Sequence, residues 1–213
     1  MSTNKNKAQL YAMHYVAPIG GMVVAASAEG ITGLWLDEQK YFGGTCEEDM
    51  ADAVKVLVED SSVRVDESAA HPLDFEEGKQ ALDHLSQAKN WLDRYFAGEA
   101  PTPDELTLAP RGTEFRMKVW RILCEIPYGK TTTYGDIAKQ IAAEEGKKTM
   151  SSQAVGGAVG HNPISIIIPC HRVVGSTGSL TGYAGGIKRK MALLELEGAD
   201  MDKFFVPKHS TAM

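Results

Sequence analysis

The residues of this sequence best suited to chemistry stand together at Cys170, His171 and Arg172, directly after Pro169. A cysteine is a weak nucleophile as a thiol and a strong one as a thiolate, and a base or a positive charge beside it favours the thiolate. Histidine supplies a base here and arginine a positive charge. The pattern indicates a nucleophilic cysteine. A buried cysteine that only packs is the alternative, and these residues alone leave both open.

The five residues before the proline, 164–168, read Ile-Ser-Ile-Ile-Ile. An apolar, β-branched run of this kind predicts a buried strand, and proline ends a strand because it cannot donate to the ladder. Such a strand would present Cys170 at the end of a rigid element. Because neighbouring strand side chains point to opposite faces, His171 can reach Cys170 only if the chain turns after Pro169 or through a water.

Composition limits the class of protein. The 213 residues suffice for one large or two small domains, and no apolar run approaches the ~20 residues of a membrane span. The first ten residues lack the apolar core of a signal peptide. Three widely spaced cysteines, Cys46, Cys124 and Cys170, argue against a disulfide framework and a structural zinc site. We therefore expect a protein of a reducing compartment such as the cytoplasm, without a structural metal site or a membrane partner.

Charge is distributed unevenly along the chain. Up to residue 105 there are 8 Lys and Arg against 19 Asp and Glu, a balance of −11, and beyond it 14 against 9, a balance of +5. The overall charge of −6 therefore hides a basic second half, which favours a nucleic-acid partner for that half. Ordinary variation of charge along a chain is the alternative.

The first half predicts a sheet and one helix. Three apolar runs within residues 11–37 are separated by Gly-Gly and Glu-Gly, which are hairpin signals, so we expect an antiparallel sheet. Residues 44–72 are acidic and are predicted to form a solvated helix or loop. Residues 74–96 have helical apolar spacing, Gly98 ends that helix, and the proline-rich segment after it predicts a domain boundary at residue 105.

The second half predicts three capped helices and a closing one. Thr113, Thr133 and Ser151 or Ser152 are suited to cap successive helices, the second with Asp136 in a capping box. The second and third resemble a helix-turn-helix unit, whose recognition helix would contain Gly156 and Gly157. Those glycines imply close approach of another backbone, either nucleic acid or a packed neighbour. Glycines at 175–186 surround Tyr183 and could close around a ligand, and residues 187–197 form the last helix.

Six segments of the second half are similar to one known family, the 6-O-alkylguanine-DNA alkyltransferases, or methylated-DNA–protein-cysteine methyltransferases. They read GTEFRMKVW, IPYGKTTTYGDIA, AVGGAVGHNP, IPCHRVVG, GYAGGIKRK and LLELEG. The resemblance implies an α+β fold with two domains. Residues 1–105 would form a ribonuclease-H-like domain of antiparallel sheet and helix. Residues 106–213 would form a winged-helix-like, helix-turn-helix domain for DNA binding and alkyl transfer.

The resemblance also implies DNA repair by an enzyme that acts once. A guanine alkylated at O6 would flip out of double-stranded DNA, and Cys170 would take the alkyl group by direct displacement. His171 would act as base through a water, Glu197 would orient it, Asn162 would order the turn, and Tyr134 would assist the leaving guanine. The guanine pocket would be lined by Val174, Tyr183, Ala184 and Gly185. The protein would be consumed once per lesion, as a monomer without an obligatory protein partner.

The same resemblance implies DNA contacts on the helix-turn-helix unit from Gln153, Ala154, Gly156 and Tyr134. Phosphate contacts are predicted for the basic residues Arg116, Lys147, Lys148 and Arg172. Many relatives carry an arginine where Gln153 stands, so weaker DNA binding or a different intercalating role is expected. The loop around residues 144–150 is longer than in shorter members. Some relatives hold zinc in the first domain, but here only Cys46 could contribute, so no zinc is expected.

Three other functions compete with this interpretation. A protein that recognises alkylated bases without transfer would lack the cysteine, which is present. A helix-turn-helix regulator that senses alkylation or oxidation would carry an extra N-terminal cysteine cluster, which is missing from this sequence. A Cys-His hydrolase places its histidine far from its cysteine in sequence and needs an oxyanion hole, so adjacent Cys170 and His171 fit it poorly.

Overall fold

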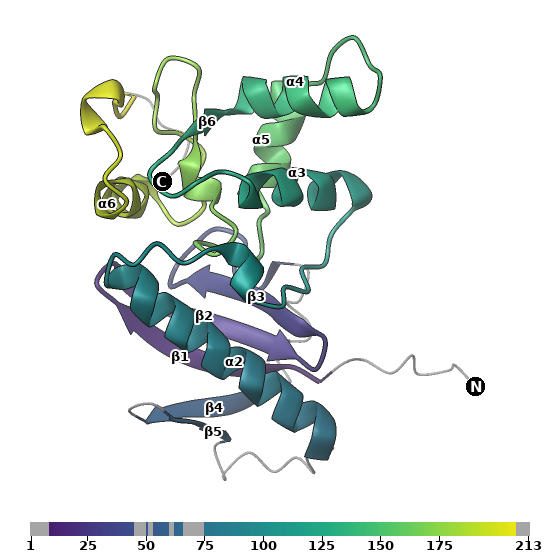
Figure 1. Cartoon of the computed structure of the whole chain (residues 1–213), viewed down its shortest axis with the longest axis vertical. Coiled ribbons are helices and arrows are strands. Elements are labelled where there is room, and N and C mark those ends of the chain that lie inside the picture. Colours follow the sequence, from purple (N-terminus) through teal and green to yellow (C-terminus); the bar gives the residue numbers. More distant parts are fainter. Residues whose placement is uncertain (1–8, 45–49, 51–52, 60–61, 66–74, 208–213) are drawn as a thin grey trace.

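The structure is a computed structural model that describes residues 9–44, 50, 53–59, 62–65 and 75–207. It is a mixed α+β protein with two parts, as expected. A sheet crossed by one long helix forms the first part, and a group of shorter helices forms the second (Figure 1). None of the described helices is both long enough and apolar enough to cross a membrane.

The sheet has five strands in the order β3-β2-β1-β4-β5. The predicted antiparallel hairpins are confirmed as β1 Tyr11–Ala17, β2 Gly20–Ser27 and β3 Gly30–Leu36. β4 Val54–Glu59 pairs parallel with β1, and β5 Ser62–Val65 pairs antiparallel with β4. β3 lies at the edge nearest the second part, and all seven of its residues are buried.

The prediction of a solvated helix or loop at residues 44–72 is wrong at residues 54–59 and 62–65, where β4 and β5 lie. Residues 45–49, 51–52, 60–61 and 66–72 of the segment lie outside the description. The segment is acidic, but it contains alternating valines at 54, 56 and 58, a spacing typical of strands.

The long helix α2, Phe75–Phe96, packs on β1, β2 and β3, which confirms the predicted helix (Figure 1). Its buried stripe has helical spacing and consists of Ala81, Leu85, Ala88, Trp91, Leu92 and Tyr95. Gly98 ends it with a φ of 82°, a conformation that glycine adopts without strain. The chain then forms a short turn, Pro103–Glu105, and returns to β3, where Ile31 exchanges backbone hydrogen bonds with residues 107 and 109.

The second part contains α3 Glu114–Cys124, α4 Tyr134–Glu144, α5 Ser152–Gly160 and α6 Ile187–Leu196. The three predicted caps are confirmed: Thr113, Thr133 and Ser151 each accept a backbone N–H from the first turn. α4 and α5 pack as consecutive helices joined by a short loop, the predicted helix-turn-helix arrangement. Two short strands, β6 Thr132–Thr133 and β7 Val173–Val174, pair in parallel.

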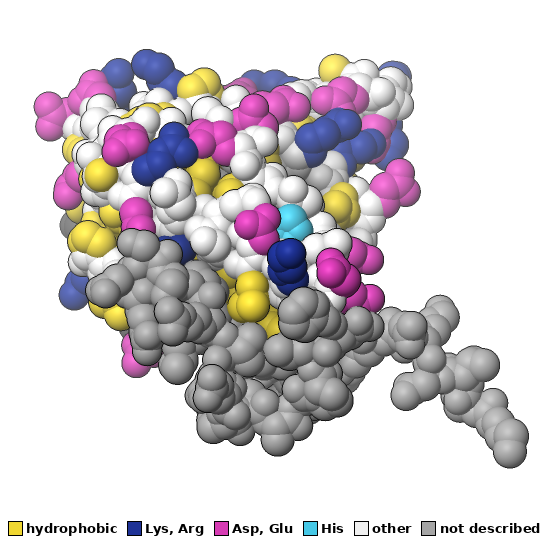
Figure 2. Space-filling view, turned by 60° about the horizontal axis from the view of Figure 1, so that its bottom comes forward, with side chains coloured by type: hydrophobic (Ala, Val, Ile, Leu, Met, Phe, Trp, Pro, Cys, Tyr) yellow, Lys and Arg dark blue, Asp and Glu magenta, His cyan; other side chains and the backbone are white. Residues whose placement is uncertain are grey.

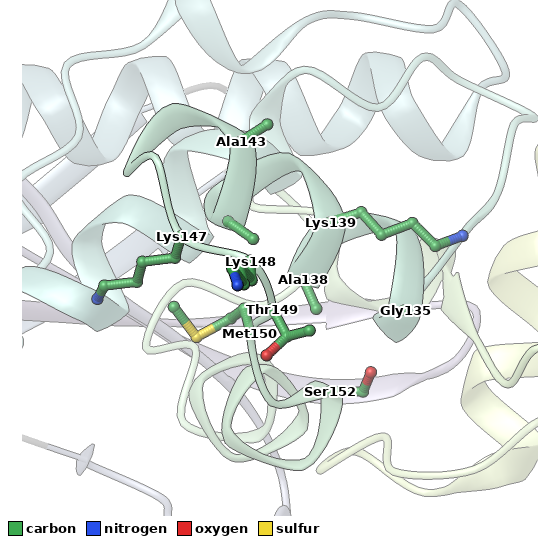
Figure 3. Close-up of a pocket in the computed structure, with 10 residues that line it drawn as sticks. Gly135, Ala138, Lys139, Ala143, Lys147, Lys148, Thr149, Met150 and Ser152 are labelled. Atoms are coloured by element: carbon green, nitrogen blue, oxygen red, sulfur yellow. The ribbon is translucent and has the colours of Figure 1, made fainter.

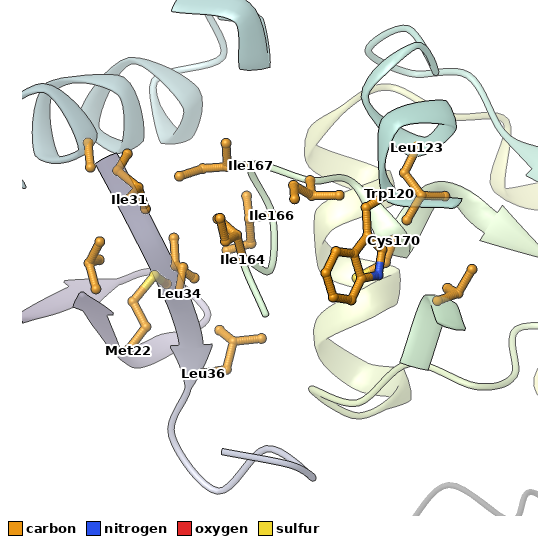
Figure 4. Close-up of a cluster of buried hydrophobic side chains, with 14 of the residues drawn as sticks. Met22, Ile31, Leu34, Leu36, Trp120, Leu123, Ile164, Ile166, Ile167 and Cys170 are labelled. Atoms are coloured by element: carbon orange, nitrogen blue, oxygen red, sulfur yellow. The ribbon is translucent and has the colours of Figure 1, made fainter. Parts of the chain in front are cut away.

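The predicted strand at residues 164–168 is wrong, although its burial is confirmed. Only Ile164 makes a bridge, to Leu34 of β3, and the chain then turns back on itself through hydrogen bonds such as Ile168 N to Ile164 O. Ile166 adopts a φ of 70°, which is rare for a β-branched residue. The apolar run is buried because it is wedged between the sheet and the second part, with Trp120 on its far side (Figure 4).

Substitution of Leu34 tests how strongly residues 164–168, named the wedge from here on, join the two parts of the protein. Leu34→Ala should lower the free energy of unfolding by about 2–5 kcal/mol, because it leaves a cavity beside Ile164. Val16→Ala is the control, since 74% of Val16 is exposed, and should change stability by less than about 0.5 kcal/mol. Chemical denaturation measures both. Equal effects of the two substitutions would contradict the packing described.

Candidate active site

Cys170 begins a single 3-10 turn, Cys170–Arg172, that follows Pro169. The chain therefore turns after the proline, which is one of the two ways foreseen for His171 to approach Cys170. The thiol is only 5% exposed. It belongs to the same buried cluster as Trp120 and Leu123 of α3, which Figure 4 draws with it. A buried thiol at the end of a fixed turn needs neighbours that keep it in place and change its acidity.

Asn162 supplies the first of those neighbours. Its Nδ2 lies 3.1 Å from Cys170 Sγ and 2.8 Å from Ile168 O, and its Oδ1 accepts the N–H of Ile164 at 3.1 Å. The amide therefore ties the start of the wedge to its end and points a donor at the sulfur. Such a donor stabilises a thiolate more than a thiol.

Glu197 is the centre of a buried network. It stands at the end of α6, and its Oε1 lies 2.7 Å from His171 Nε2. Arg172 donates to both carboxylate oxygens, through Nε to Oε2 and Nη2 to Oε1, each at 2.9 Å. Tyr95 of α2 donates its hydroxyl to Oε1 at 2.6 Å, and the Gly129 N–H lies 3.2 Å from Oε2. Both oxygens of the carboxylate thus accept from more than one donor.

The position after Tyr128 requires a glycine, and Gly129 occupies it. Its φ is 69°, and a Cβ at this position would lie 2.5 Å from Glu197 O. Only glycine allows both the turn and this approach. The turn at residues 127–130 thus lets the backbone reach the carboxylate.

Burial shifts the pKa values of Cys170 and His171 against proton transfer from thiol to imidazole, and their polar neighbours offset part of this effect. Burial raises the pKa of Cys170, while Asn162 and the charge of Lys190 lower it in part. Burial also lowers the pKa of His171, against the pull of Glu197, so the imidazole is neutral and able to accept a proton. Burial opposes ionisation of Glu197, but hydrogen bonds from His171 and Arg172 overcome it and lower its pKa to about 2.

His171 makes no direct hydrogen bond to Cys170 among the described residues. Because Nε2 lies against Glu197, Nδ1 is the remaining ring nitrogen, and it is buried without a protein partner in the described part of the chain. A water between Nδ1 and the sulfur is the second route foreseen from the sequence. A buried polar atom of this kind normally has a partner of some sort.

Lys190 was missed by the sequence analysis. It is fully buried, and its ammonium donates to Val173 O and Thr181 O. Burial lowers its pKa to about 8, against the opposing effect of Cys170. The sequence held a signal, because Lys190 lies three and four residues before Leu193 and Leu194, on the apolar face of the last helix.

Tyr134 opens α4 and points its hydroxyl at Thr181 O, 3.1 Å away. Burial raises its pKa to about 12, and Cys170 adds to this effect. Gly156 lies against its ring, since a Cβ there would come 3.8 Å from it. Gly157 has nothing within 4 Å, and 3.8 Å at Gly156 is an ordinary contact, so internal packing requires glycine at neither position.

A pocket of about 180 Å³ opens beside these residues. Tyr183 and Ala184, two of the four residues expected to line a guanine pocket, line it with Gly156, Gly157, Gly160, His161 and Gly182. The other two, Val174 and Gly185, do not line it: Val174 is buried against Leu180 and Leu194, and Gly185 packs against Leu36. The assignment of these four residues to a guanine pocket stays a prediction.

Two further lining residues, Lys40 and Tyr41, come from the first part and were not predicted. The Tyr41 ring stacks on His161 with centroids 4.3 Å apart, and Lys40 N donates to Ala184 O at 3.1 Å. Nothing in the sequence connects this loop with the pocket, because the contact depends on how the two parts pack.

The predicted DNA contacts fall into two groups. Gln153 and Ala154 are exposed on the first turn of α5, and Lys147 and Lys148 line a groove between α4 and the loop before α5 (Figure 3). Arg172, in contrast, is 4% exposed and bound to Glu197 and Ile126 O. The structure thus contradicts the phosphate contact predicted for it.

Charges of both signs stand side by side on one face of the molecule (Figure 2). Lys118 and Lys147 both pair with Glu145, and Arg121 pairs with Glu144.

Among the described residues, no group of three His, Cys, Asp or Glu side chains is placed to hold a metal ion. Cys46 lies outside the description.

Comparison with known proteins identifies the family. Residues 10–110 match the ribonuclease-like domain of 6-O-methylguanine DNA methyltransferase, and residues 114–199 match the DNA-binding domain of the same family. The chain belongs to the 6-O-methylguanine DNA methyltransferase family. The two matches divide between residues 110 and 114, whereas the boundary at residue 105 stays a prediction.

Two curated family members named methylated-DNA–protein-cysteine methyltransferase illustrate the similarity. The protein of Methanosarcina acetivorans is 40% identical over 190 residues, which cover 89% of this chain and 99% of the relative. The protein of Mycobacterium tuberculosis is 55% identical over 113 residues, which cover 53% of this chain and 65% of the relative.

Solved structures of the 6-O-methylguanine DNA methyltransferase family share the fold. The crystal structure of the Mycobacterium tuberculosis O6-methylguanine methyltransferase is 39% identical, with a TM-score of 0.65, over 89% of this chain and 93% of that one. The mycobacterial protein in complex with DNA is 36% identical, with a TM-score of 0.64, over 91% and 94% of the two chains.

The roles of Arg172 and Lys148 can be separated by experiment. Arg172→Met should lower the free energy of unfolding by about 3–5 kcal/mol, because it leaves Glu197 buried without its cation. Lys148→Met, on the exposed groove, should change stability by less than about 0.5 kcal/mol but weaken DNA binding and reduce its salt slope by about 0.9. Denaturation and salt-dependent binding measure these effects. A stable Arg172 variant with weakened DNA binding would contradict the buried assignment.

Proposed function

We propose that this protein repairs alkylated DNA by moving the alkyl group of 6-O-alkylguanine to Cys170, once per protein molecule. The observation that carries the proposal is the arrangement around the sulfur. Asn162 points a donor at Sγ, Lys190 supplies a nearby positive charge, and His171 presents an unpartnered Nδ1 backed by Glu197. Such an arrangement activates a thiol without a metal or organic cofactor.

The alkylated base must leave the duplex before it can meet Cys170. The pocket lined by Tyr183 and Ala184 is the proposed place for the flipped guanine. The exposed first turn of α5, with Gln153 and Ala154, is the proposed contact to the DNA around the gap. Gly157 leaves open space on the same helix, and that space admits a nucleic-acid backbone.

The transfer itself is a displacement at carbon. The sulfur forms a bond to the alkyl carbon, and the bond between that carbon and guanine O6 breaks. The thiol proton passes through a water to His171 Nδ1, and Tyr134 supplies a proton to the departing guanine. The proton on His171 then returns through solvent to the Tyr134 oxygen, so that both residues end in their starting states. The products are a thioether and ordinary guanine. Water does not displace a thioether, so the protein is not regenerated.

Double-stranded DNA with an alkylated guanine is the proposed partner. The mycobacterial relative solved in complex with DNA supports this, as do the lysines on the groove beside α4. We also keep the sequence-based proposals that the protein acts as a monomer, in the cytoplasm, and without an obligatory protein partner. A reducing compartment suits a reaction that needs a free thiol.

The proposal is tested on the DNA product. A duplex with one 6-O-methylguanine should regain guanine at one lesion per protein molecule, measured by nucleoside chromatography after digestion. Cys170→Ser should still bind the duplex but regain no guanine. Cys124→Ser is the matched control, because Cys124 is half-buried in α3 with its pKa raised to about 11 by burial, and it should act as wild type. Full repair by the Cys170 variant would overturn the proposal.

Gln153 offers a test of the DNA-binding helix. Gln153→Arg should tighten binding to DNA and steepen the dependence of log affinity on log salt by about 0.9, because it adds one cation at the α5 N-terminus. Gln140→Arg adds the same charge on α4 beside Glu125 and Glu144 and should change the slope less. Equal slopes for the two variants would place the DNA elsewhere.

A further inference from the structure

The hydroxyl of Tyr95 enters the active-site network from the first part of the protein. It lies in the last turn of α2, is fully buried, and donates to Glu197 Oε1 at 2.6 Å. It also lies 3.5 Å from His171 Nε2. Its partners in the network lie 76 and 102 residues away along the chain.

Aromatic packing fixes the position of that hydroxyl. The Tyr95 ring stacks on Trp91 with centroids 5.3 Å apart and meets Phe96 and Tyr128 edge to face at 5.2 and 5.9 Å. A ring held on three sides cannot turn its oxygen away from Glu197 without disturbing the end of α2. The packing of the ring therefore keeps the hydroxyl at Glu197 Oε1.

Three donors share one carboxylate oxygen. Besides Tyr95, Glu197 Oε1 meets Arg172 Nη2 at 2.9 Å and His171 Nε2 at 2.7 Å. A charged oxygen that serves several donors holds each of them less strongly than it would hold a single one. The Tyr95 bond therefore limits how much of the carboxylate's charge acts on the imidazole.

We propose that Tyr95 is a positioning residue for alkyl transfer, which sets the orientation and basicity of His171 through Glu197. The inference rests on the proposed function for its kinetic consequence, but not for its effect on His171. It gives the first part of the protein a direct share in the chemistry, in addition to its structural role.

Several groups face His171, and they act in opposite directions. They are Glu197 at the end of α6, Lys190 within α6, Arg172 and Cys170 on its own turn, Tyr183 within the glycine-rich residues 175–186, and Tyr95 on α2. Glu197 favours a proton on His171, while Arg172 and Lys190 oppose it. Without the Tyr95 hydroxyl, Glu197 would attract that proton more strongly, so the pKa of His171 would rise.

The direct test is a pH titration of the His171 ring nitrogens by NMR in the protein without DNA. In Tyr95→Phe, the pKa of His171 should rise by about half a unit to one unit relative to wild type. The control is Tyr15→Phe. It removes a similar hydrogen bond, from the Tyr15 hydroxyl on β1 to Asp93 on α2 at 2.8 Å, which lies on the exposed surface. It should titrate as wild type.

A second substitution at the same site guards against a folding defect in the first. Fluorotyrosine at position 95 keeps the ring and the hydroxyl but donates a stronger hydrogen bond, so the pKa of His171 should shift downward. Shifts in opposite directions for the two replacements support the proposal. Titrations that match wild type in both would overturn it, as would a rise in Tyr15→Phe equal to that in Tyr95→Phe.

The kinetic test uses single-turnover transfer from 6-O-methylguanine DNA. Because neutral His171 is the active base, activity is present above its pKa, and Tyr95→Phe should move the acidic limb of the rate profile to higher pH. Near that limb the variant should be slower by about threefold to tenfold, with unchanged DNA affinity. Absence of transfer in wild type would contradict the proposed function alone, since the NMR titration decides the role of Tyr95 separately.

Discussion

A buried carboxylate, Glu197, is the acceptor on which this active site depends. It receives Arg172 and His171 from the nucleophile's own turn, Tyr95 from the helix of the first part, and the Gly129 N–H from the turn after α3. Three segments far apart in sequence are thus held by one charged group. Because the interior penalises an unpaired charge, each of them is restrained to the position that completes the network.

The wedge at residues 164–168 performs the corresponding task on the other side of Cys170. Its turn is closed by Asn162, and it bridges the edge strand β3 through Ile164 and Leu34 (Figure 4). The sulfur therefore sits between an apolar support and a polar network. The apolar support makes the site rigid, and the polar network provides a route for the proton. Both include residues from the part of the chain that contains the sheet, Leu34 in the support and Tyr95 in the network.

Local signals predicted the elements well, and tertiary context decided the rest. Thr113 and Thr133 cap helices as expected, because capping depends on a few neighbouring residues. The prediction of a strand at the wedge was wrong, because burial between the two parts of the protein favours the same apolar residues as burial within a sheet. The DNA role foreseen for Arg172 failed because sequence shows a charge but not its partner. Tyr95 could not be foreseen, since its contact to Glu197 spans 102 residues.

The central claim is that the alkyl group ends on Cys170 and stays there. It is tested most directly by intact mass measurement of the protein after incubation with a duplex carrying one methylated guanine, followed by peptide mapping. The account predicts one added methyl per molecule, on the peptide that contains Cys170, with Cys46 and Cys124 unmodified even when DNA is in excess. Binding to the lesion without any gain in mass, or a methyl on another residue, would contradict it.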